Sequence, residues 1–352
     1  MARRPRPRQL LLEGTEMASE IKTGPQLRPS VLRRLLRGAQ LELRMLLLLL
    51  LLAVALSLIS PYFFTLSNIL NLMDQSVITG IVAIGQTFVI LIAGIDLSVG
   101  SLTGATGIIL GLSLAELPLP IAILAAIVAG GLAGFVNGFI ITKGRVAAFI
   151  VTLGMMSVGR SMAYVLSGAN SISQLPDSLG DLASSTILGV PTNFAVLVVL
   201  YGVAWYYLTF TKGGRTIYAI GSNAEAARTA GLRVDFYSVL VYVISGALSA
   251  VAAVFLAARI LSIDPIAATG LELDTIAAVV IGGASLFGGR GTIIGTFIGV
   301  VIMVLIRNGL NLLNVNPYWQ GTAIGSIIVA AVLLERFLSA REGMHRSQEE
   351  EG

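Results

Sequence analysis

The residues able to do chemistry are few, and they lie in short polar breaks between long apolar runs. In residues 93–100, Gly94 is suited to ending one helix, and Asp96 or Ser98 to capping the next. A tight reversal or a broken helix is therefore predicted, and irregular backbone within a membrane is tolerated where it lines a path or is buried in protein. The break is a candidate hinge, although capping alone would already account for the Asp96 carboxylate.

A second break has the sequence Gly-Gly-Arg-Gly at residues 288–291. Its arginine, Arg290, would either belong to a gate or extend its long side chain to the water interface. Together the two breaks supply the candidate gate residues, which are Gly94, Asp96, Ser98, Gly100, Gly288, Gly289, Arg290 and Gly291.

Polar side chains within the apolar runs are candidates for lining a path. Arg160 and Arg307 fall inside such runs, and a charge near the bilayer centre costs about 2.5 to 3.5 kcal/mol on insertion scales. Both should therefore face protein or water. Arg307 and Asn311 share one helix face, which is compatible with a polar wall and equally with an internal packing cluster. Gln86 and Asn137 complete the pathway candidates.

The polar loop of residues 211–235 holds the most informative short helix. Ser222 and Glu225 have the spacing of a capping box, and Gly231 is a good helix stop. The helix between them would be about two turns long, below the roughly 12 residues that an isolated helix needs in water. Either a groove on a cytoplasmic partner or the surface of its own protein must hold it. The candidate docking residues are Ser222, Asn223, Glu225, Ala226, Ala227, Arg228 and Gly231.

The elements that must position these residues are membrane spans. Hydrophobic residues make up 55% of the 352 positions and charged residues only 12%, about half the charged fraction of a soluble domain. Since a helix needs about 20 apolar residues to cross the hydrocarbon core, the apolar runs predict an all-α, polytopic bundle of about ten transmembrane helices. The predicted spans are residues 45–60, 75–94, 98–115, 119–141, 146–167, 191–210, 236–257, 273–286, 292–313 and 319–335.

The arginine and lysine residues predict the orientation. If the Arg-rich N-terminus is cytoplasmic, the other Lys-containing and Arg-containing loops fall on the same side, as the positive-inside rule requires, and both termini are cytoplasmic. The chain then divides into a basic tail with a surface helix (residues 1–44), a transmembrane domain (45–337) and a polar tail (338–352). Membrane orientation, rather than nucleic-acid binding, explains the net charge of +4.

Glycine stripes and an internal similarity extend this picture. Glycines recur every fourth residue, for example at Gly130, Gly134 and Gly138, which favours close helix packing over a binding role. Five residues between Ile92 and Thr103 match residues from Ile281 onward at one constant offset. The match fits an internal duplication, which is common in transporters, and equally fits chance in a chain rich in Gly and Leu.

Several kinds of function are disfavoured. The chain has no cysteine, and its one histidine, His345, lies in the polar C-terminal tail, so no metal site is expected. No phosphate-binding loop, nucleophile motif or interior carboxylate pair supports an enzyme or an ATP site on this chain. An ion-coupled secondary transporter usually needs acidic residues or histidines within the membrane. Five acidic residues that could have served instead fall near predicted span ends: Asp74, Asp96, Glu116, Asp235 and Asp274.

Five motifs, in their order along the chain, resemble those of a known family. They are Gly-Ile-Asp-Leu-Ser-Val-Gly at 94–100, Asn-Gly at 137–138, Thr-Leu-Gly at 152–154, Gly-Ser-Asn-x-x-Ala-Ala-x-x-x-Gly at 221–231 and Gly-Gly-Ala-Ser-Leu-Phe-Gly-Gly-Arg-Gly at 282–291. The family is that of the permease subunits of ribose-type simple-sugar ABC importers. The resemblance runs from about Leu46 to Phe337, and the Arg-rich N-terminal extension lies outside it.

The resemblance implies a transport subunit, not an enzyme, in a bacterial inner membrane. By resemblance, two permease copies form the path for a monosaccharide, ATPase subunits that bind ATP and Mg²⁺ dock at the cytoplasmic face, and an extracytoplasmic binding protein delivers the sugar. Residues 223–230 match the segment that engages the ATPase, and the expected mechanism is alternating access. A permease for branched-chain amino acids or an ion-coupled secondary transporter is the alternative.

Overall fold

The computed structural model describes residues 31–316, 319, 321–322, 325–326 and 329, with side chains from Glu42 onward. The chain forms two units, Met1–Gln40 and Leu41–Gly352, and the second contains all of the sites described below. Most of the predicted N-terminal tail (1–44), most of the predicted last span (319–335) and the whole predicted C-terminal tail (338–352) lie outside the described residues.

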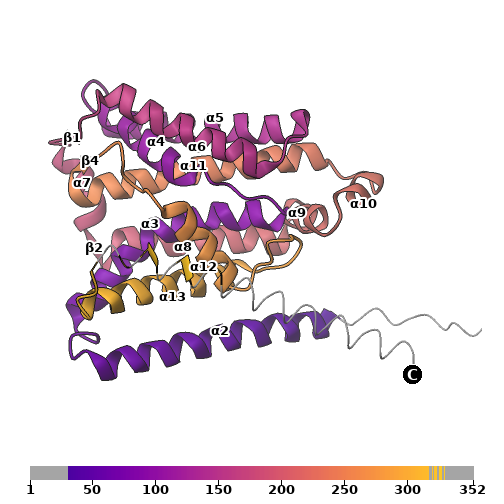
Figure 1. Ribbon diagram of the computed structural model, residues 1–352, viewed down its shortest axis with the longest axis horizontal. Coiled ribbons are helices and arrows are strands. Elements are labelled where there is room, and N and C mark those ends of the chain that lie inside the picture. The colour runs from indigo at the N-terminus through magenta and orange to yellow at the C-terminus, as the bar shows by residue number, and fades with distance from the viewer. Residues whose placement is uncertain (1–30, 317–318, 320, 323–324, 327–328, 330–352) are drawn as a thin grey trace, which may run out of the picture. The chain divides into compact units, whose positions relative to one another are not determined.

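Most of the described chain is helical, as expected where apolar segments must satisfy their own backbone hydrogen bonds. The helices are α2 (Val31–Ile59), α3 (Leu66–Leu91), α4 (Val99–Ser113), α5 (Leu119–Gly144), α6 (Ala148–Ser167), α7 (Asp177–Ser184), α8 (Thr192–Phe210), α9 (Lys212–Ser222), α10 (Ala224–Thr229), α11 (Val234–Ile260), α12 (Leu271–Ile281) and α13 (Ile293–Leu312). Figure 1 shows α3 and α11 side by side in the main unit, with α9 and α10 at one end.

Short strands lie at the other end of this unit. β1 (Ile172–Ser173) pairs antiparallel with β4 (Ser262–Ile263), with Ile172 opposite Ile263. β2 (Thr186–Ile187) and β3 (Val190–Pro191) form a hairpin just before α8. The end with the strands is called the strand end, and the end with α9 and α10 is called the α10 end.

Seven helices in the described part of the chain are long and apolar enough to cross a membrane: α2 (over Glu42–Ile59), α3, α5, α6, α8, α11 and α13. The protein is therefore a polytopic helical membrane protein, as predicted. Two further predicted spans, 98–115 and 273–286, correspond to the shorter helices α4 and α12. The total of ten spans stays a prediction, because most of the tenth lies outside the described residues.

The two shorter helices begin inside the molecule. The 11 residues of α12 rise about 16 Å, roughly half the thickness of a hydrocarbon core. Its N-terminus meets that of α4, since a Cβ added at Gly100 would overlap the Glu272 carboxylate. The chain therefore turns back into the interior twice. It does so in the first return segment, residues 92–98 between α3 and α4, and in the second return segment, residues 261–270 between α11 and α12.

This geometry corrects the position of two carboxylates. The sequence places Asp96 and Asp274 near span ends, with Asp96 on the cytoplasmic side. In the structure Asp96 has no exposed surface, and Asp274 is also buried. The reason is that both lie where a half-length helix begins, which is deep in the bundle and not at its rim.

The internal similarity pairs helices of unequal length. At its constant offset, the 26-residue α3 corresponds to the 11-residue α12, and the 15-residue α4 to the 20-residue α13. The elements match better as α3, first return segment and α4 against α11, second return segment and α12, with the second set running in the opposite direction. This is the arrangement of an inverted repeat.

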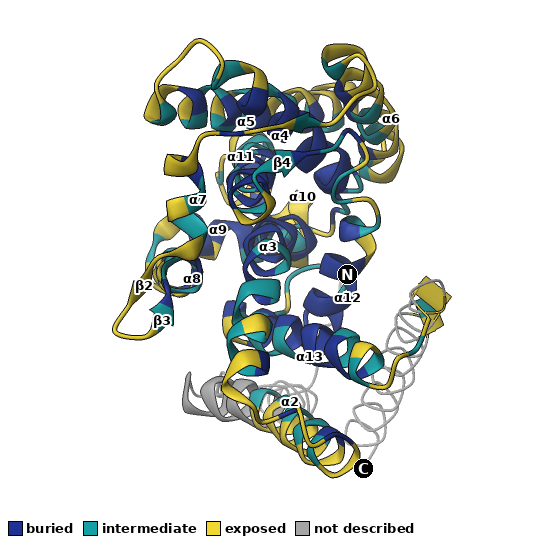
Figure 2. Ribbon diagram, turned by 90° about the vertical axis from the view of Figure 1, so that its left-hand side faces the viewer, coloured by how far each residue is buried: buried dark blue, intermediate teal, exposed yellow. Residues whose placement is uncertain are grey.

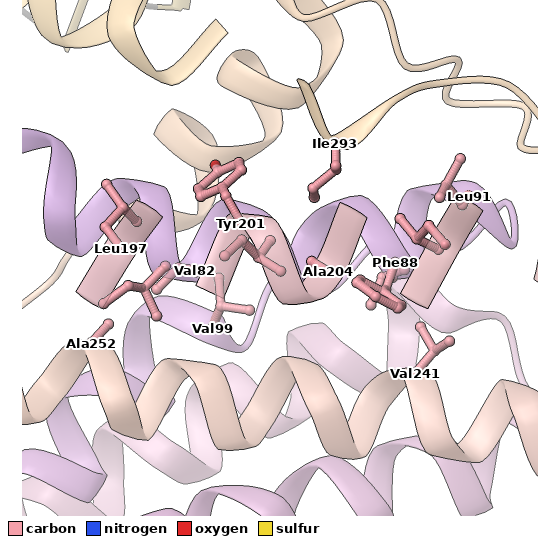
Figure 3. Close-up of a cluster of buried hydrophobic side chains, with 14 of the residues drawn as sticks. Val82, Phe88, Leu91, Val99, Leu197, Tyr201, Ala204, Val241, Ala252 and Ile293 are labelled. Atoms are coloured by element: carbon pink, nitrogen blue, oxygen red, sulfur yellow. The ribbon is translucent and has the colours of Figure 1, made fainter. Parts of the chain in front are cut away.

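The core surrounds α3. Figure 2 shows α3 mostly buried, while α5 and α6 are exposed over much of their surface, as expected for helices that face lipid. Figure 3 shows part of this core, where Val82 and Phe88 of α3 lie near Leu197 and Tyr201 of α8 and Val241 of α11. Dispersion contacts of this kind hold helices together where lipid is as apolar as the side chains.

The predicted packing role of two glycine stripes is confirmed. Gly130 and Gly134 of α5 lie against the backbone of α11 at Gly246 and Tyr242, and Gly299 of α13 lies against α12. A Cβ at any of these positions would overlap a backbone carbonyl oxygen. The stripes therefore bring helix backbones into direct contact.

Candidate functional site

The short helix predicted in the loop of residues 211–235 is α10, and it has only six residues. Such a helix is unstable alone, so caps and packing must hold it. The Asn223 side chain accepts a hydrogen bond from the Ala226 backbone N–H at 2.9 Å. Ala227 is buried between Ile220 and Val234, and Ile92 of the first return segment packs against the same cluster.

The capping box predicted for Ser222 and Glu225 is wrong. Helix α9 continues through Ser222, whose hydroxyl donates to the Tyr218 carbonyl at 2.9 Å, so the cap shifts by one residue to Asn223. Glu225 is exposed. A capped helix does begin here, but Ser222 belongs to the end of α9 and therefore cannot cap α10.

An ion-pair cluster ties α10 to its neighbours. Asp235, at the start of α11, accepts from Arg228 at 3.0 Å and from Lys143 of α5 at 2.7 Å. Exposed pairs contribute only about 0.2 to 1 kcal/mol each, so they orient α10 more than they stabilise the fold. Most of the remaining surface of α10 and its caps is exposed: Asn223, Ala224, Glu225, Ala226, Thr229 and Ala230.

The preceding helix, α9, contacts both helix breaks. Gly289 belongs to the glycine turn, residues 282–292 between α12 and α13, and its N–H donates to the Leu91 carbonyl at 2.9 Å. A Cβ at Gly221 would overlap this carbonyl oxygen and lie 2.5 Å from the Gly289 nitrogen. The Tyr218 hydroxyl donates to the Gly291 carbonyl at 2.9 Å. Burial raises the pKa of Tyr218 to about 12, so the donor stays protonated.

The first break does not use the predicted glycine for its left-handed residue, whereas the glycine turn does use glycines. In the first, the Gly94 N–H donates to the Val89 carbonyl at 2.9 Å, yet the left-handed residue is Ala93, with φ of 62°. Gly94 is instead a site of close approach, because a Cβ there would overlap the Tyr242 hydroxyl. In the glycine turn the positive φ angles fall on glycines as expected, including Gly288 and Gly289.

A buried polar network holds the first return segment. One carboxylate oxygen of Asp96 accepts from the Ser98 N–H at 3.0 Å and the Ser98 hydroxyl at 2.6 Å, and the other accepts from the Ser245 hydroxyl of α11 at 2.9 Å. The Asn137 amide of α5 donates to the Ser98 hydroxyl at 3.0 Å. The Thr152 hydroxyl of α6 lies 3.1 Å from the Ile95 carbonyl oxygen, which accepts its hydrogen bond. The network thus ties the segment to three other helices.

A guanidinium holds the second return segment. Arg160 of α6 donates to the carbonyls of Pro265 and Ala267 at 2.7 and 3.1 Å. Asp264 accepts from the Ser171 hydroxyl at 2.6 Å and the Ile266 N–H at 2.8 Å, and these two donors lower its pKa. The segment is therefore anchored to α6 and to the strand end.

Other polar side chains are distributed between helices. Arg307 pairs with Asp274, which joins α13 to α12, and the amides of Asn68 and Asn308 exchange two hydrogen bonds between α3 and α13. Gln86 is fully buried, and neither of its amide atoms has a hydrogen-bond partner among the described residues.

The chain matches a family model described as "Branched-chain amino acid transport system / permease component" over residues 68–332. It is 40% identical over 291 residues to the ribose import permease of Haemophilus influenzae, a match that covers 81% of this chain and 90% of the relative. The chain belongs to this family of ABC transporter permeases. The ribose import permease of Escherichia coli K12 is 42% identical (79% of this chain, 88% of the relative), and the D-allose permease of the same strain 36% (80% and 87%). No solved structure matches the chain.

In this permease the predicted docking residues meet part of each predicted gate, whereas Asp96, Ser98 and Gly100 lie in the interior. Ser222 lies against Gly289, and Gly288 lies against Ala93 and the Gly221 carbonyl, so the loop helix and both breaks meet at the α10 end. Arg290 is exposed beside them. The roles of these residues in docking and gating stay predictions.

The predicted pathway residues lie in different parts of the bundle. Asn137 joins the Asp96 network, Gln86 is buried in α3, Arg307 is paired with Asp274, and Asn311 is exposed. Sequence reasoning missed Ser245 and Glu272, because neither stands in a motif and each acquires its neighbours from segments far along the chain. The glycine-rich motifs identify one partner of each of these contacts, but they do not identify the residue that packs against it.

Proposed function

We propose that this permease is the transmembrane subunit of an ABC importer that moves a ribose-like monosaccharide across the bacterial inner membrane. The observation that carries the proposal is the identity of 40 to 42% with ribose import permeases over about four-fifths of the chain. A relative whose name specifies D-allose supports a monosaccharide as the class of substrate. The description of the family model supports branched-chain amino acids as the alternative.

Three partners follow from this proposal. An ATPase subunit docks on the exposed face of α10 and supplies the ATP and Mg²⁺ sites. A sugar-binding protein docks at the strand end, which is then extracytoplasmic, and a second permease copy completes the path. The spans number ten, and both termini lie in the cytoplasm.

The mechanism is alternating access driven from α10. Closure of the ATPase domains on ATP pushes α10, which contacts Ile92 in the first return segment through the cluster around Ala227. The half-length helices α4 and α12 then shift where their N-termini meet, near Gly100 and Glu272. Helices that begin inside the membrane commonly form the substrate site of transporters, and repeats move against each other around that site.

Affinity purification from the native membrane, followed by mass spectrometry and an ATPase assay, tests the proposal. An ATPase chain should co-purify, and Ala226→Trp on the exposed face of α10 should lower its recovery at least tenfold, a loss of about 1.4 kcal/mol. Ser184→Trp, on an exposed residue of α7 at the strand end, is the matched control. The proposal fails if no ATPase is recovered and vesicles holding this chain alone take up D-ribose along an ion gradient.

A further inference from the structure

Three backbone segments meet at one point at the α10 end. Gly221 of α9, Leu91 at the end of α3 and Gly289 of the glycine turn lie so close that a Cβ at Gly221 would overlap the Leu91 carbonyl oxygen. The Gly289 N–H donates to that same carbonyl at 2.9 Å. Leu91 lies far before Gly221 in the sequence and Gly289 lies far after it, and no side chain stands between the three segments.

Each of the two breaks leads directly to a half-length helix. Leu91 precedes the first return segment and α4, and the glycine turn follows the C-terminus of α12. A displacement of α9 would therefore reach both helices whose N-termini meet in the interior. Contact through Ala227 and Ile92 alone would reach only the first of them.

The hydroxyl of Tyr218 adds a second attachment to the glycine turn. It donates to the Gly291 carbonyl at 2.9 Å, three residues along α9 from Gly221. Two contacts on one helix fix both the position and the rotation of the turn relative to α9. Small rearrangements at packed contacts of this kind are transmitted because the packing has discrete arrangements and does not deform continuously.

We propose that Gly221 and Tyr218 are positioning residues that join α9 to both helix breaks, so that one movement of α10 shifts α4 and α12 together. This inference rests on the proposed function. In this proposal α9 transmits the movement to α4 and α12, and the exposed face of α10 binds the ATPase. We call these contacts of Gly221 and Tyr218 with Leu91 and the glycine turn the joint. Disrupting the joint should lower transport per ATP hydrolysed while the ATPase stays bound.

The test uses the full chain reconstituted in proteoliposomes with its co-purifying ATPase and binding protein, with D-ribose as the probe. Gly221→Ala should keep the ATPase bound and lower the ribose moved per ATP hydrolysed about tenfold, within the usual range of coupling between sites. Tyr218→Phe, which removes one hydrogen bond and little volume, should lower the same ratio about fivefold. Gly202→Ala is the control, because a Cβ at Gly202 of α8 meets nothing within 4 Å.

The possible outcomes are distinct. Wild-type ribose-to-ATP ratios in both variants would overturn the joint, as would a loss of ATPase binding that parallels the loss of transport. If Gly221→Ala fails to fold, Tyr218→Phe decides alone: a lowered ratio supports the joint, and an unchanged ratio overturns it. If the wild-type chain recovers no ATPase, the proposed function fails, and the joint fails with it.

Discussion

The first return segment folds around a buried anion, whereas the second is held by a cation that reaches it from another helix. At the first, Asp96 and its donors Ser98 and Ser245 are almost completely excluded from solvent. At the second, Arg160 binds two backbone carbonyls, and the nearby Ile266 and Thr269 are exposed. Both devices satisfy backbone and side-chain groups that an irregular segment would otherwise leave unpaired.

The difference teaches which segment can move at low cost. A buried donor that loses its partner costs about 1 to 3 kcal/mol, because no water replaces the lost bond. An exposed group loses much less, because water takes the place of the partner. The first return segment should thus move only as one unit with the helices that hold it, and the second is the easier one to release from its partners. The comparison can be tested on stability alone, without knowledge of the substrate.

The largest effect is expected for Asp96→Ala. The substitution leaves the Ser98 N–H, the Ser98 hydroxyl and the Ser245 hydroxyl without their acceptor, so the free energy of unfolding should fall by about 3 kcal/mol or more. Thermal unfolding in detergent measures the change. Asp264→Ala is the matched control at the second return segment, and its loss should be about 1 kcal/mol or less. Equal losses in the two variants would remove the distinction between the segments.

An intermediate effect is expected for Arg160→Met, which keeps much of the side-chain length and removes the charge. The carbonyls of Pro265 and Ala267 lose their shared donor, and the cost should be about 1 to 3 kcal/mol. The change should be local: hydrogen exchange should speed up in residues 261–270 and stay unchanged in residues 92–98. Faster exchange in both segments would mean that they are held as one unit.

Much of the fold follows from the sequence, because apolar length is a strong signal in a membrane protein. The predicted spans 119–141 and 191–210 agree closely with α5 and α8. Helix α3 instead begins at Leu66, well before the predicted residue 75. The reason lies in Asn68 and Asp74, which look like the end of a span in sequence but pair with Asn308 of α13 and Asn193 of α8.

Of the Asp96 network, only the residues in the first return segment could be predicted from the sequence. Asp96 and Ser98 stand out because they interrupt an apolar run, and their mutual hydrogen bonds are local. Ser245, 149 residues further along the chain, has no such mark, since a serine in an apolar helix is common and its partner is set by helix packing. The sequence likewise did not predict that α4 and α12 begin inside the bundle, because the length of a short apolar run does not show where in the membrane it begins.

The smallest effect expected is a dependence of the second return segment on pH. The Ser171 hydroxyl and the Ile266 N–H hold the pKa of Asp264 below its usual value, and the charge of Arg160 acts in the same direction. A carboxyl with a lowered folded-state pKa contributes stability that is fully present above the unfolded pKa of about 3.9 and is lost as the pH falls through the folded value. Hydrogen exchange in residues 261–270, corrected for its intrinsic pH dependence, should therefore become faster only below about pH 4. Ser171→Ala removes the strongest of these donors and brings the folded pKa of Asp264 closer to the unfolded value, so the acceleration of exchange on acidification should become smaller. An acceleration as large in Ser171→Ala as in the wild type would contradict this prediction, and Arg160 would then be the main group that holds the second return segment.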